Sequence, residues 1–226
     1  MKHLVVGAGE VGTAVHAVLS RSHPTLLRDL EPVDATTDVL DVCIPWSEKF
    51  VDIVHTYRAE HQADMVVVHS TVPVGTCDRE GWVHSPIRGR HPDLEEGVAS
   101  FTKHFGGHRA DEAASEWKTI GVDVESHPRA AETEAGKLWE LVQYGVQIRV
   151  EKSIHAWCVA HGLDPQVVYT RMARTYNSGY EDLGFSDFVR PVLEHVPGDI
   201  GGHCVLPMSH LLDHPMAWIV REGFSS

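Results

Sequence analysis

The sequence predicts an α/β protein with a doubly wound parallel sheet, followed by a long central helix and a small helical C-terminal region. Three observations lead to this prediction. Short runs rich in Val, Ile and Leu recur along residues 4–107, and stretches with apolar residues at helical spacing separate them. Continuous apolar runs are typical of strands in a parallel sheet that helices cover on both faces. From Ala130 to about His161, a proline-free stretch with helical periodicity follows.

The predicted strands follow one another along the first half of the chain. The segment L-V-V-G-A-G-E-V-G predicts a buried strand, a glycine turn and the start of a helix. Residues 47–62 are one of the helical stretches between strands. Further strands are expected at T-L-L-R-D, V-L-D-V-C-I-P, M-V-V-V-H-S-T, G-W-V-H-S-P and T-K-H-F-G-G.

The pattern changes near Pro128, which divides the chain into an expected nucleotide-binding domain, residues 1–128, and a helical region, residues 129–226. A helix from Ala130 to about His161 would be about 45 Å long, which exceeds the width of a small domain. We therefore expect it to pack against another helix, with a homodimer through this helix as the predicted assembly. Its apolar surface comprises Leu138, Leu141, Val142, Gly145, Val146 and Ile148.

The segment G-L-D-P-Q, residues 162–166, is expected to end the long helix and to start a shorter one at Pro165. After it we expect an aromatic loop, T-Y-N-S-G-Y, and an opening at G-D-I-G-G-H-C. These segments form the expected small C-terminal region.

Composition excludes several classes of protein. The net charge of −13 argues against nucleic-acid binding, which needs clustered Lys and Arg. No apolar run is long enough to cross a bilayer, and the first residues do not resemble a signal peptide. The four cysteines lack a CxxC pair, which favours reduced thiols in a cytoplasmic protein. The 17 histidines are scattered and predict no metal site.

The most informative motif is G-A-G-E-V-G, residues 7–12, which includes Glu10 and Val11 and lies between a predicted strand and a helix. Gly7 permits a tight turn, Gly9 lets a pyrophosphate approach the backbone, and Gly12 allows close helix packing. Asp29 ends the second predicted strand, where a carboxylate binds the adenosine ribose and favours NAD over NADP. The predicted cofactor is NAD. The structural alternative is a glycine-rich turn in a fold that has lost its nucleotide.

The segment H-S-T-V-P-V-G-T, residues 69–76, follows the fourth predicted strand. Ligands bind at the carboxyl ends of the strands in open α/β sheets. Ser70 and Thr71, and Pro45 at the end of the third strand, are therefore assigned to the cofactor site. The alternative is an ordinary strand end and turn.

Several motifs occur together in one order: G-x-G-x-V-G, S-T-V-P-V-G-T, the Ser-Pro of S-P-I-R-G, E-x-x-K-L and G-G-H-C. In this order the chain resembles the UDP-glucose/GDP-mannose dehydrogenase family over most of its length. The resemblance implies NAD-dependent oxidation of a sugar-nucleotide alcohol, with Cys204 as the nucleophile and Lys137 as the lysine that handles protons. The chain departs from the family at Leu141 and Ile87, where Asn and Glu are usual, and C-V-L-P-M-S lacks the usual acid. We expect a short member without the C-terminal UDP-binding domain.

For Cys204, the residues themselves leave three interpretations open. It is a nucleophile if His203, a lysine or a helix N-terminus lowers the pKa of its thiol. It is a metal ligand if it joins His203, His210 and His214, although this is no recognised zinc spacing. It is otherwise a small buried thiol.

For Lys137 the alternatives are a stem that reaches solvent and a buried acid or base near the cofactor.

Other polar side chains are candidates for the substrate and catalytic sites. Asn177 could supply the amide that is missing at position 141, and Tyr176 and Tyr180 could stack on a substrate ring. The alternative is a structured turn with aromatic anchors. Arg88 and Arg90 follow the fifth predicted strand, where they could bind an anionic substrate or form a solvated loop. His203, beside the cysteine, is assigned to the substrate site as well.

The function predicted from the sequence is hydride transfer between NAD and a small hydroxyl or carbonyl substrate. A protein that binds NAD(H) without catalysis, such as a sensor or an assembly subunit, is the main alternative. A transferase on the same fold is another, because the fold alone does not determine the chemistry.

Overall fold

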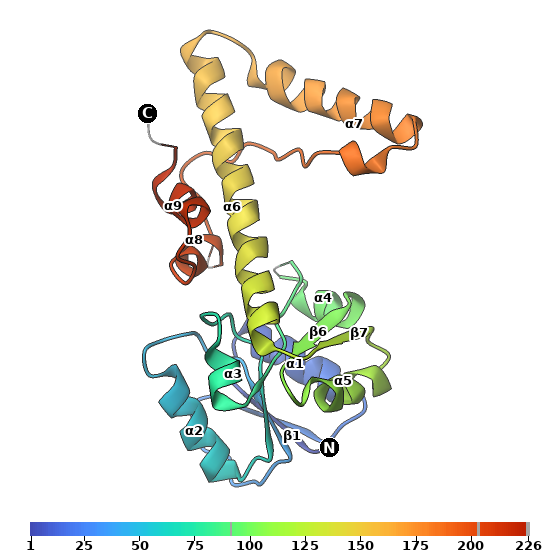
Figure 1. Ribbon diagram of the computed structural model, residues 1–226, viewed down its shortest axis with the longest axis vertical. Helices are drawn as coiled ribbons and strands as arrows, with labels where there is room; N and C mark the ends of the chain where they lie inside the picture. Colours follow the sequence, from blue (N-terminus) through green and yellow to red (C-terminus); the bar gives the residue numbers. More distant parts are fainter. Residues whose placement is uncertain (91, 203, 225–226) are drawn as a thin grey trace. The chain divides into compact units, whose positions relative to one another are not determined.

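The computed structural model describes residues 1–90, 92–202 and 204–224 (Figure 1). His203 therefore lies outside the described residues, and its predicted role stays a prediction. The strands are β1 (His3–Val6), β2 (Thr25–Arg28), β3 (Val39–Val42), β4 (Met65–Val68), β5 (Val83–His84), β6 (Lys103–Gly106) and β7 (Val124–His127). The helices are α1 (Glu10–Leu19), α2 (Phe50–His61), α3 (Thr76–Glu80), α4 (Leu94–Ser100), α5 (Ala110–Thr119), α6 (Ala130–Ala160), the π-helix η1 (Gln166–Arg171), α7 (Met172–Asp182), the 3-10 helix η2 (Ser186–Phe188), α8 (Val205–Ser209) and α9 (Pro215–Glu222).

The strands form a seven-stranded sheet in the order β2-β1-β3-β4-β5-β6-β7. Neighbouring strands are parallel except β5 and β6, which pair antiparallel. Val6, the last residue of β1, lies level with Arg28 of β2 and Val42 of β3. The turns that follow these three strands therefore start side by side at one edge of the sheet.

Helices cover the sheet on both faces, which confirms the predicted doubly wound fold. Successive residues of a strand point to opposite faces. Accordingly, Val5 belongs to one buried core, while Leu4 and Val6 belong to the other. Helices α1, α4 and α5 contribute apolar residues to the first core, and α2 and α3 contribute to the second. Figure 1 shows these helices around the sheet.

The structure corrects two sequence expectations. The strand β7 was not predicted, because V-E-S-H has a single apolar residue and forms a half-exposed edge of the sheet. The segment T-Y-N-S-G-Y was predicted as a loop, but it lies within the helix α7. On that helix Tyr176 and Tyr180 lie one turn apart and contact each other, with ring centroids 4.7 Å apart.

The long helix α6 has the predicted position, with 31 residues from Ala130 to Ala160. By compactness the chain divides within this helix into two units, Met1–Lys137 and Leu138–Ser226. The predicted functional boundary at residue 128 stays a prediction. In the second unit, α8 and α9 pack on α6 around a core of Val142, Ile200, Val205, Ala217 and Val220.

The second unit also exposes large apolar side chains along α6, among them Tyr144, Trp157 and Val159. A homodimer through this helix stays a prediction. Within the part of the chain that the structure describes, we find no helix with the length and hydropathy needed to span a membrane.

Two glycines in α6 are expected to respond oppositely to alanine. A Cβ at Gly136 meets nothing within 4 Å, so Gly136→Ala should raise the free energy of unfolding by about 1 kcal/mol through helix propensity. A Cβ at Gly145 lies 2.8 Å from methyl groups of both Val205 and Val220. Overpacking costs about 1–3 kcal/mol, so Gly145→Ala should lower the free energy of unfolding despite the gain in propensity. Urea unfolding followed by circular dichroism measures both changes, and a stabilised Gly145→Ala would contradict this packing.

Candidate functional site

The glycine turn between β1 and α1 contains two glycines that the fold requires. Gly7 has a φ of +96°, and a Cβ on it would lie 2.7 Å from the carbonyl oxygen of Cys43. A Cβ on Gly12 would lie 1.7 Å from the carbonyl oxygen of Gly7. These two positions therefore admit no side chain, because α1 lies directly against the turn.

Gly9 is different, because the fold does not require a glycine there. Its φ of −72° and ψ of −174° suit any residue, and a Cβ on it meets nothing within 4 Å. Gly9 is the N-cap of α1 and offers no side chain to the free N–H groups of the first turn. The helix N-terminus is therefore open to an anion. Of the two residues that follow, Glu10 is exposed and Val11 packs against the core.

The carboxylate of Asp29 lies beside this turn, as the sequence predicts. Its Oδ1 accepts a hydrogen bond of 3.3 Å from the backbone N–H of Ala8, and the side chain is exposed. The neighbouring Arg28 is buried and points to α2, where its guanidinium lies 2.9 Å from Glu60 and 4.7 Å from the ring centre of Tyr57. The turn thus has an exposed carboxylate next to it, while the adjacent arginine is engaged elsewhere, and the role of Asp29 toward an adenosine ribose stays a prediction.

The other residues assigned to the cofactor lie at the same edge of the sheet. The hydroxyl of Ser70 donates to the carbonyl oxygen of Ile44 at 2.6 Å, which ties the end of β4 to the end of β3. Pro45 is exposed after that carbonyl, and Thr71 is half-buried after the serine. Ser70 therefore shapes this edge through its hydroxyl.

The helices α3 and α6 cap each other at this edge. The buried carboxylate of Glu134, on α6, accepts hydrogen bonds from the backbone N–H groups of Gly75 at 2.5 Å and Cys77 at 2.8 Å. In return Asp78, on α3, accepts from the N–H of Ala130 at 2.8 Å. Burial raises the pKa of Glu134 above its ordinary value, although these N–H groups favour its charged form.

Sequence reasoning noticed the glutamate of E-x-x-K-L only as part of a motif and missed this capping role. The available signal was the acidic residue in the first turns of a helix, paired with a short turn rich in small residues.

Lys137 lies one turn further along α6 than Glu134. Its Nζ donates a hydrogen bond of 2.8 Å to the carbonyl oxygen of Ile87, in the segment S-P-I-R-G. The side chain is half-buried, which is intermediate between the two alternatives considered from the sequence, a stem that reaches solvent and a buried acid or base. Glu134 and Lys137 thus bring three motifs together at the carboxyl edge of the sheet: S-T-V-P-V-G-T, S-P-I-R-G and E-x-x-K-L.

His84 lies beneath these motifs and is fully buried. Its Nε2 lies 3.2 Å from the carbonyl oxygen of Ser70, and its Nδ1 lies 2.8 Å from the hydroxyl of Thr133. The first contact needs an N–H on Nε2, so neutral His84 accepts through Nδ1. Burial lowers the pKa of His84 to about 3, because the cation would lose its hydration.

The two arginines assigned to the substrate follow β5. Arg88 is half-buried, and Arg90 is exposed with its guanidinium 3.6 Å from Asp93. Such an exposed pair contributes little stability. Their roles as anion ligands stay predictions.

In the second unit, Cys204 directly precedes α8 and is half-buried, which departs from the alternative of a fully buried thiol. His214 is the N-cap of α9, and its Nδ1 accepts from the N–H of Met216 at 3.2 Å. Among the described residues, the clusters able to hold a metal ion include neither Cys204 nor His214. The nucleophilic role of Cys204 stays a prediction.

Asn177 joins α7 to the chain that returns past it. Its amide donates to the carbonyl oxygen of Arg190 at 2.7 Å and accepts from the N–H of Arg190 at 3.0 Å. The guanidinium of Arg190 lies 4.1 Å from the ring centre of Tyr176, and Tyr180 stacks on Phe188. These contacts give the three predicted site residues a structural role, and their catalytic and substrate roles stay predictions.

No protein-family model matches the chain, and no curated protein matches it in sequence. Solved structures do match. The UDP-D-ManNAc dehydrogenase of Pyrococcus horikoshii is 16% identical, with a TM-score of 0.76 over 98% of this chain and 67% of that one. The UDP-N-acetyl-mannosamine dehydrogenase of Staphylococcus aureus is 17% identical, with a TM-score of 0.72 over 98% and 67%. The 3-hydroxyisobutyrate dehydrogenase of Mycobacterium tuberculosis is 14% identical, with a TM-score of 0.67 over 97% and 90%.

These similarities establish the fold. The chain has the Rossmann-like fold of dehydrogenases, which confirms at the level of the fold the resemblance predicted from the motifs. It spans about two thirds of the length of the two nucleotide-sugar dehydrogenases.

The low pKa of His84 predicts a pH dependence of stability. In the unfolded chain a histidine binds a proton near pH 6.5, whereas folded His84 does so only near pH 3. Between these values the unfolded state binds the extra proton, so stability falls as the pH falls, by about 1.4 kcal/mol per unit.

Urea unfolding from pH 7 to pH 4, followed by tryptophan fluorescence, should show this slope in the wild type and a smaller one in His84→Gln. His210→Gln removes a histidine at an exposed position and serves as the control. Equal slopes for all three proteins would show that His84 does not couple folding to protonation.

Proposed function

We propose that this chain is an NAD-dependent oxidoreductase that transfers hydride between NAD and a small hydroxyl or carbonyl substrate. The observation that supports it best is Gly9. Two neighbouring glycines are required by the fold, but Gly9 is not, and it lies at an uncapped helix N-terminus beside the exposed carboxylate of Asp29. A diphosphate that approaches the backbone closely explains a glycine there.

The residues at the carboxyl edge of the sheet fit NAD. The N–H groups at the start of α1 would bind the diphosphate, and Asp29 would accept hydrogen bonds from the ribose hydroxyls. A 2′-phosphate would meet the charge of Asp29, while Arg28 is engaged with Glu60, so NADP fits less well. When bound, NAD supplies the hydride acceptor for oxidation of an alcohol.

The catalytic assignments rest on the resemblance together with the position of Lys137. Oxidation of an alcohol to a carbonyl releases a hydride and a proton, and an amine near the reacting oxygen can take the proton. Lys137 is held at the carboxyl edge by the carbonyl of Ile87, where ligands of α/β folds bind. Cys204 is the proposed nucleophile if the reaction continues from the aldehyde to the acid.

The substrate class has two candidates. The nucleotide-sugar dehydrogenases favour a sugar derivative. The 3-hydroxyisobutyrate dehydrogenase, of which this chain covers 90%, favours a small hydroxy acid. Absorbance at the nicotinamide band, screened with UDP-sugars, GDP-mannose and 3-hydroxy acids, distinguishes them. A protein that binds NAD but turns over none of these favours the sensor or assembly subunit.

Gly9 provides a test of cofactor binding that is separate from folding. Gly9→Ala should keep the wild-type Tm, since its Cβ lies in open space, and should weaken NAD binding at least about tenfold, or 1.4 kcal/mol. Gly179→Ala places a methyl group in equally open space on α7 and should leave NAD binding unchanged. Calorimetric titration with NAD, NADH and NADP measures the affinities. No binding by the wild type would refute the proposed function.

The catalytic residues can be tested once a substrate is found. Lys137→Met should lower kcat at least about 100-fold while the Kd for NAD is unchanged, because a general base contributes that much. Lys118→Met, at an exposed position on α5, is the matched control. Cys204→Ser should stop formation of the acid and leave the aldehyde as product. Full acid formation by Cys204→Ser would remove the nucleophile assignment.

A further inference from the structure

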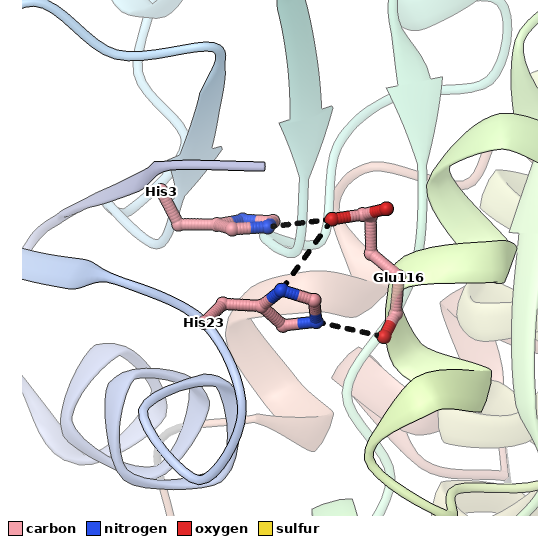
Figure 2. Close-up of side chains that lie close together, drawn as sticks. All are labelled: His3, His23 and Glu116. Carbon is pink, nitrogen blue, oxygen red and sulfur yellow. Dashed lines mark hydrogen bonds and ion pairs between the residues drawn. The ribbon is translucent and has the colours of Figure 1, made fainter.

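Three side chains that are far apart in the sequence meet at the amino edge of the sheet (Figure 2). His3 begins β1, His23 lies just before β2, and Glu116 lies on α5. One ligand atom from each, Nε2 of His3, Nδ1 of His23 and a carboxylate oxygen of Glu116, lies within 4.8 Å of the other two. All three residues belong to the first compact unit.

The spacing of these atoms suits a metal ion better than a hydrogen bond. The Oε2 of Glu116 lies 3.7 Å from Nε2 of His3 and 3.5 Å from Nδ1 of His23. Two ligands of tetrahedral zinc, each about 2.0–2.1 Å from the ion, are separated by roughly 3.4 Å. The two distances to the carboxylate oxygen thus exceed this separation by only about 0.1–0.3 Å, and all three atoms lie within 4.8 Å of one another.

The nitrogen of His3 that faces the cluster has no hydrogen-bond partner although it is buried. The side chain of His3 is 2% exposed, and its Nε2 makes no hydrogen bond. Leaving a buried polar atom unpaired costs about 1–3 kcal/mol. A bound cation would satisfy this atom.

Each histidine uses one ring nitrogen for a hydrogen bond that does not involve the three ligand atoms, which leaves a lone pair on the other nitrogen, the one that faces the carboxylate of Glu116. The Nδ1 of His3 lies 2.7 Å from the buried carboxylate of Asp41, to which it donates its proton. The Nε2 of His23 lies 3.0 Å from the carbonyl oxygen of Glu116, which requires an N–H there (Figure 2). In the neutral tautomers that these contacts select, the remaining nitrogens are acceptors. A carboxylate or carbonyl behind a ligating histidine is the usual outer shell of a metal site.

A protonated His3 paired with Glu116 is the competing arrangement. Burial alone would lower the pKa of His3, but the charge and hydrogen bond of Asp41, together with Glu116, raise it above the ordinary value. The amino group of Met1 also donates to Oε2 of Glu116, at 2.7 Å. His69 faces the other oxygen of Asp41 at 3.0 Å. Protons therefore compete with a metal ion for this cluster, and binding would release them.

We propose that His3, His23 and Glu116 bind a divalent transition-metal ion, with Zn²⁺ the best match to two imidazoles and one carboxylate. Three protein ligands leave a fourth position for water. The strands β1 and β2 are parallel, and the glycine turn follows the carboxyl end of β1. The cluster lies at the opposite edge, so the ion would join β1, β2 and α5 and stabilise the first unit.

A second histidine cluster provides the matched control. His104, Glu125 and His127 also lie close enough to share an ion. There, however, Nδ1 of His104 lies 3.0 Å from Nε2 of His127, so the two rings hydrogen-bond to each other. No side-chain nitrogen or oxygen of these three residues is buried without a hydrogen-bond partner.

The test is zinc binding by the full chain, carrying a C-terminal tag without histidines and treated with a chelator first. Zn²⁺ is titrated in competition with a chromophoric chelator at pH 7.5, and Tm is measured with and without the ion. We expect one tight site per chain and a higher Tm with zinc, because the ion binds only the folded state. Co²⁺ in place of zinc should give the intense visible bands of four-coordinate cobalt.

Two variants locate the site. His23→Gln and Glu116→Gln should each weaken zinc binding by at least about 100-fold and abolish the rise in Tm. Loss of a residue that only supports a ligand costs up to about 100-fold in metal affinity, and loss of a ligand itself should cost at least as much. His127→Gln should keep both the zinc affinity and the rise in Tm. Circular dichroism shows whether each variant folds. If His23→Gln does not fold, Glu116→Gln still tests the site. A wild type without a stoichiometric site, or loss of the site in His127→Gln alone, overturns the proposal.

Discussion

The buried carboxylate of Glu134 is the interaction on which the carboxyl edge of the sheet depends. It accepts two N–H groups at the start of α3, while Asp78 of α3 accepts N–H groups at the start of α6. Charge-assisted hydrogen bonds of this kind are worth about 1.5–3 kcal/mol each. Because the two helices cap each other, the turn after β4 and the first turns of α6 have one relative position. Lys137 lies one turn further along α6, so the same contacts position it, and its Nζ donates to the carbonyl oxygen of Ile87.

The glycine turn contains two glycines that packing requires and one that packing does not require. Gly7 and Gly12 have backbone atoms where a side chain would be, so their identity follows from packing alone. Gly9 has open space and ordinary dihedral angles, so packing does not account for it. The sequence motif alone does not distinguish these roles, because all three positions are glycine. The surroundings of each Cβ position make it.

A buried polar chain extends through the sheet from its amino edge. Asp41, in β3, lies between His3 and His69, and His69 continues to the carbonyl oxygen of Ser85 at 2.9 Å. Lys103, in β6, faces the same carbonyl, and burial lowers its pKa to about 7. Its Nζ lies 4.5 Å from the ring centre of Trp117. Charged and polar groups are costly inside a sheet unless they are paired. Most polar side-chain atoms of this buried series, from His3 through Asp41 and His69 to Lys103, have a partner. Two buried side-chain atoms along it have no hydrogen-bond partner: Oγ of Ser85 and Nε2 of His3, which faces His23 and Glu116.

The sequence by itself determined six of the strands, the glycine turn with Asp29, and the extent of α6, because these depend on local periodicity and on turn residues. It did not reveal β7, an edge strand with one apolar residue, and T-Y-N-S-G-Y became helix α7 because contacts with Arg190 and Phe188 outweigh its weak helix propensity. Only the tertiary structure decided that Glu134 caps α3 and that His3, His23 and Glu116 share one point. Such contacts join residues far apart along the chain, and their geometry comes from the packing of the sheet, which leaves no local pattern in the sequence.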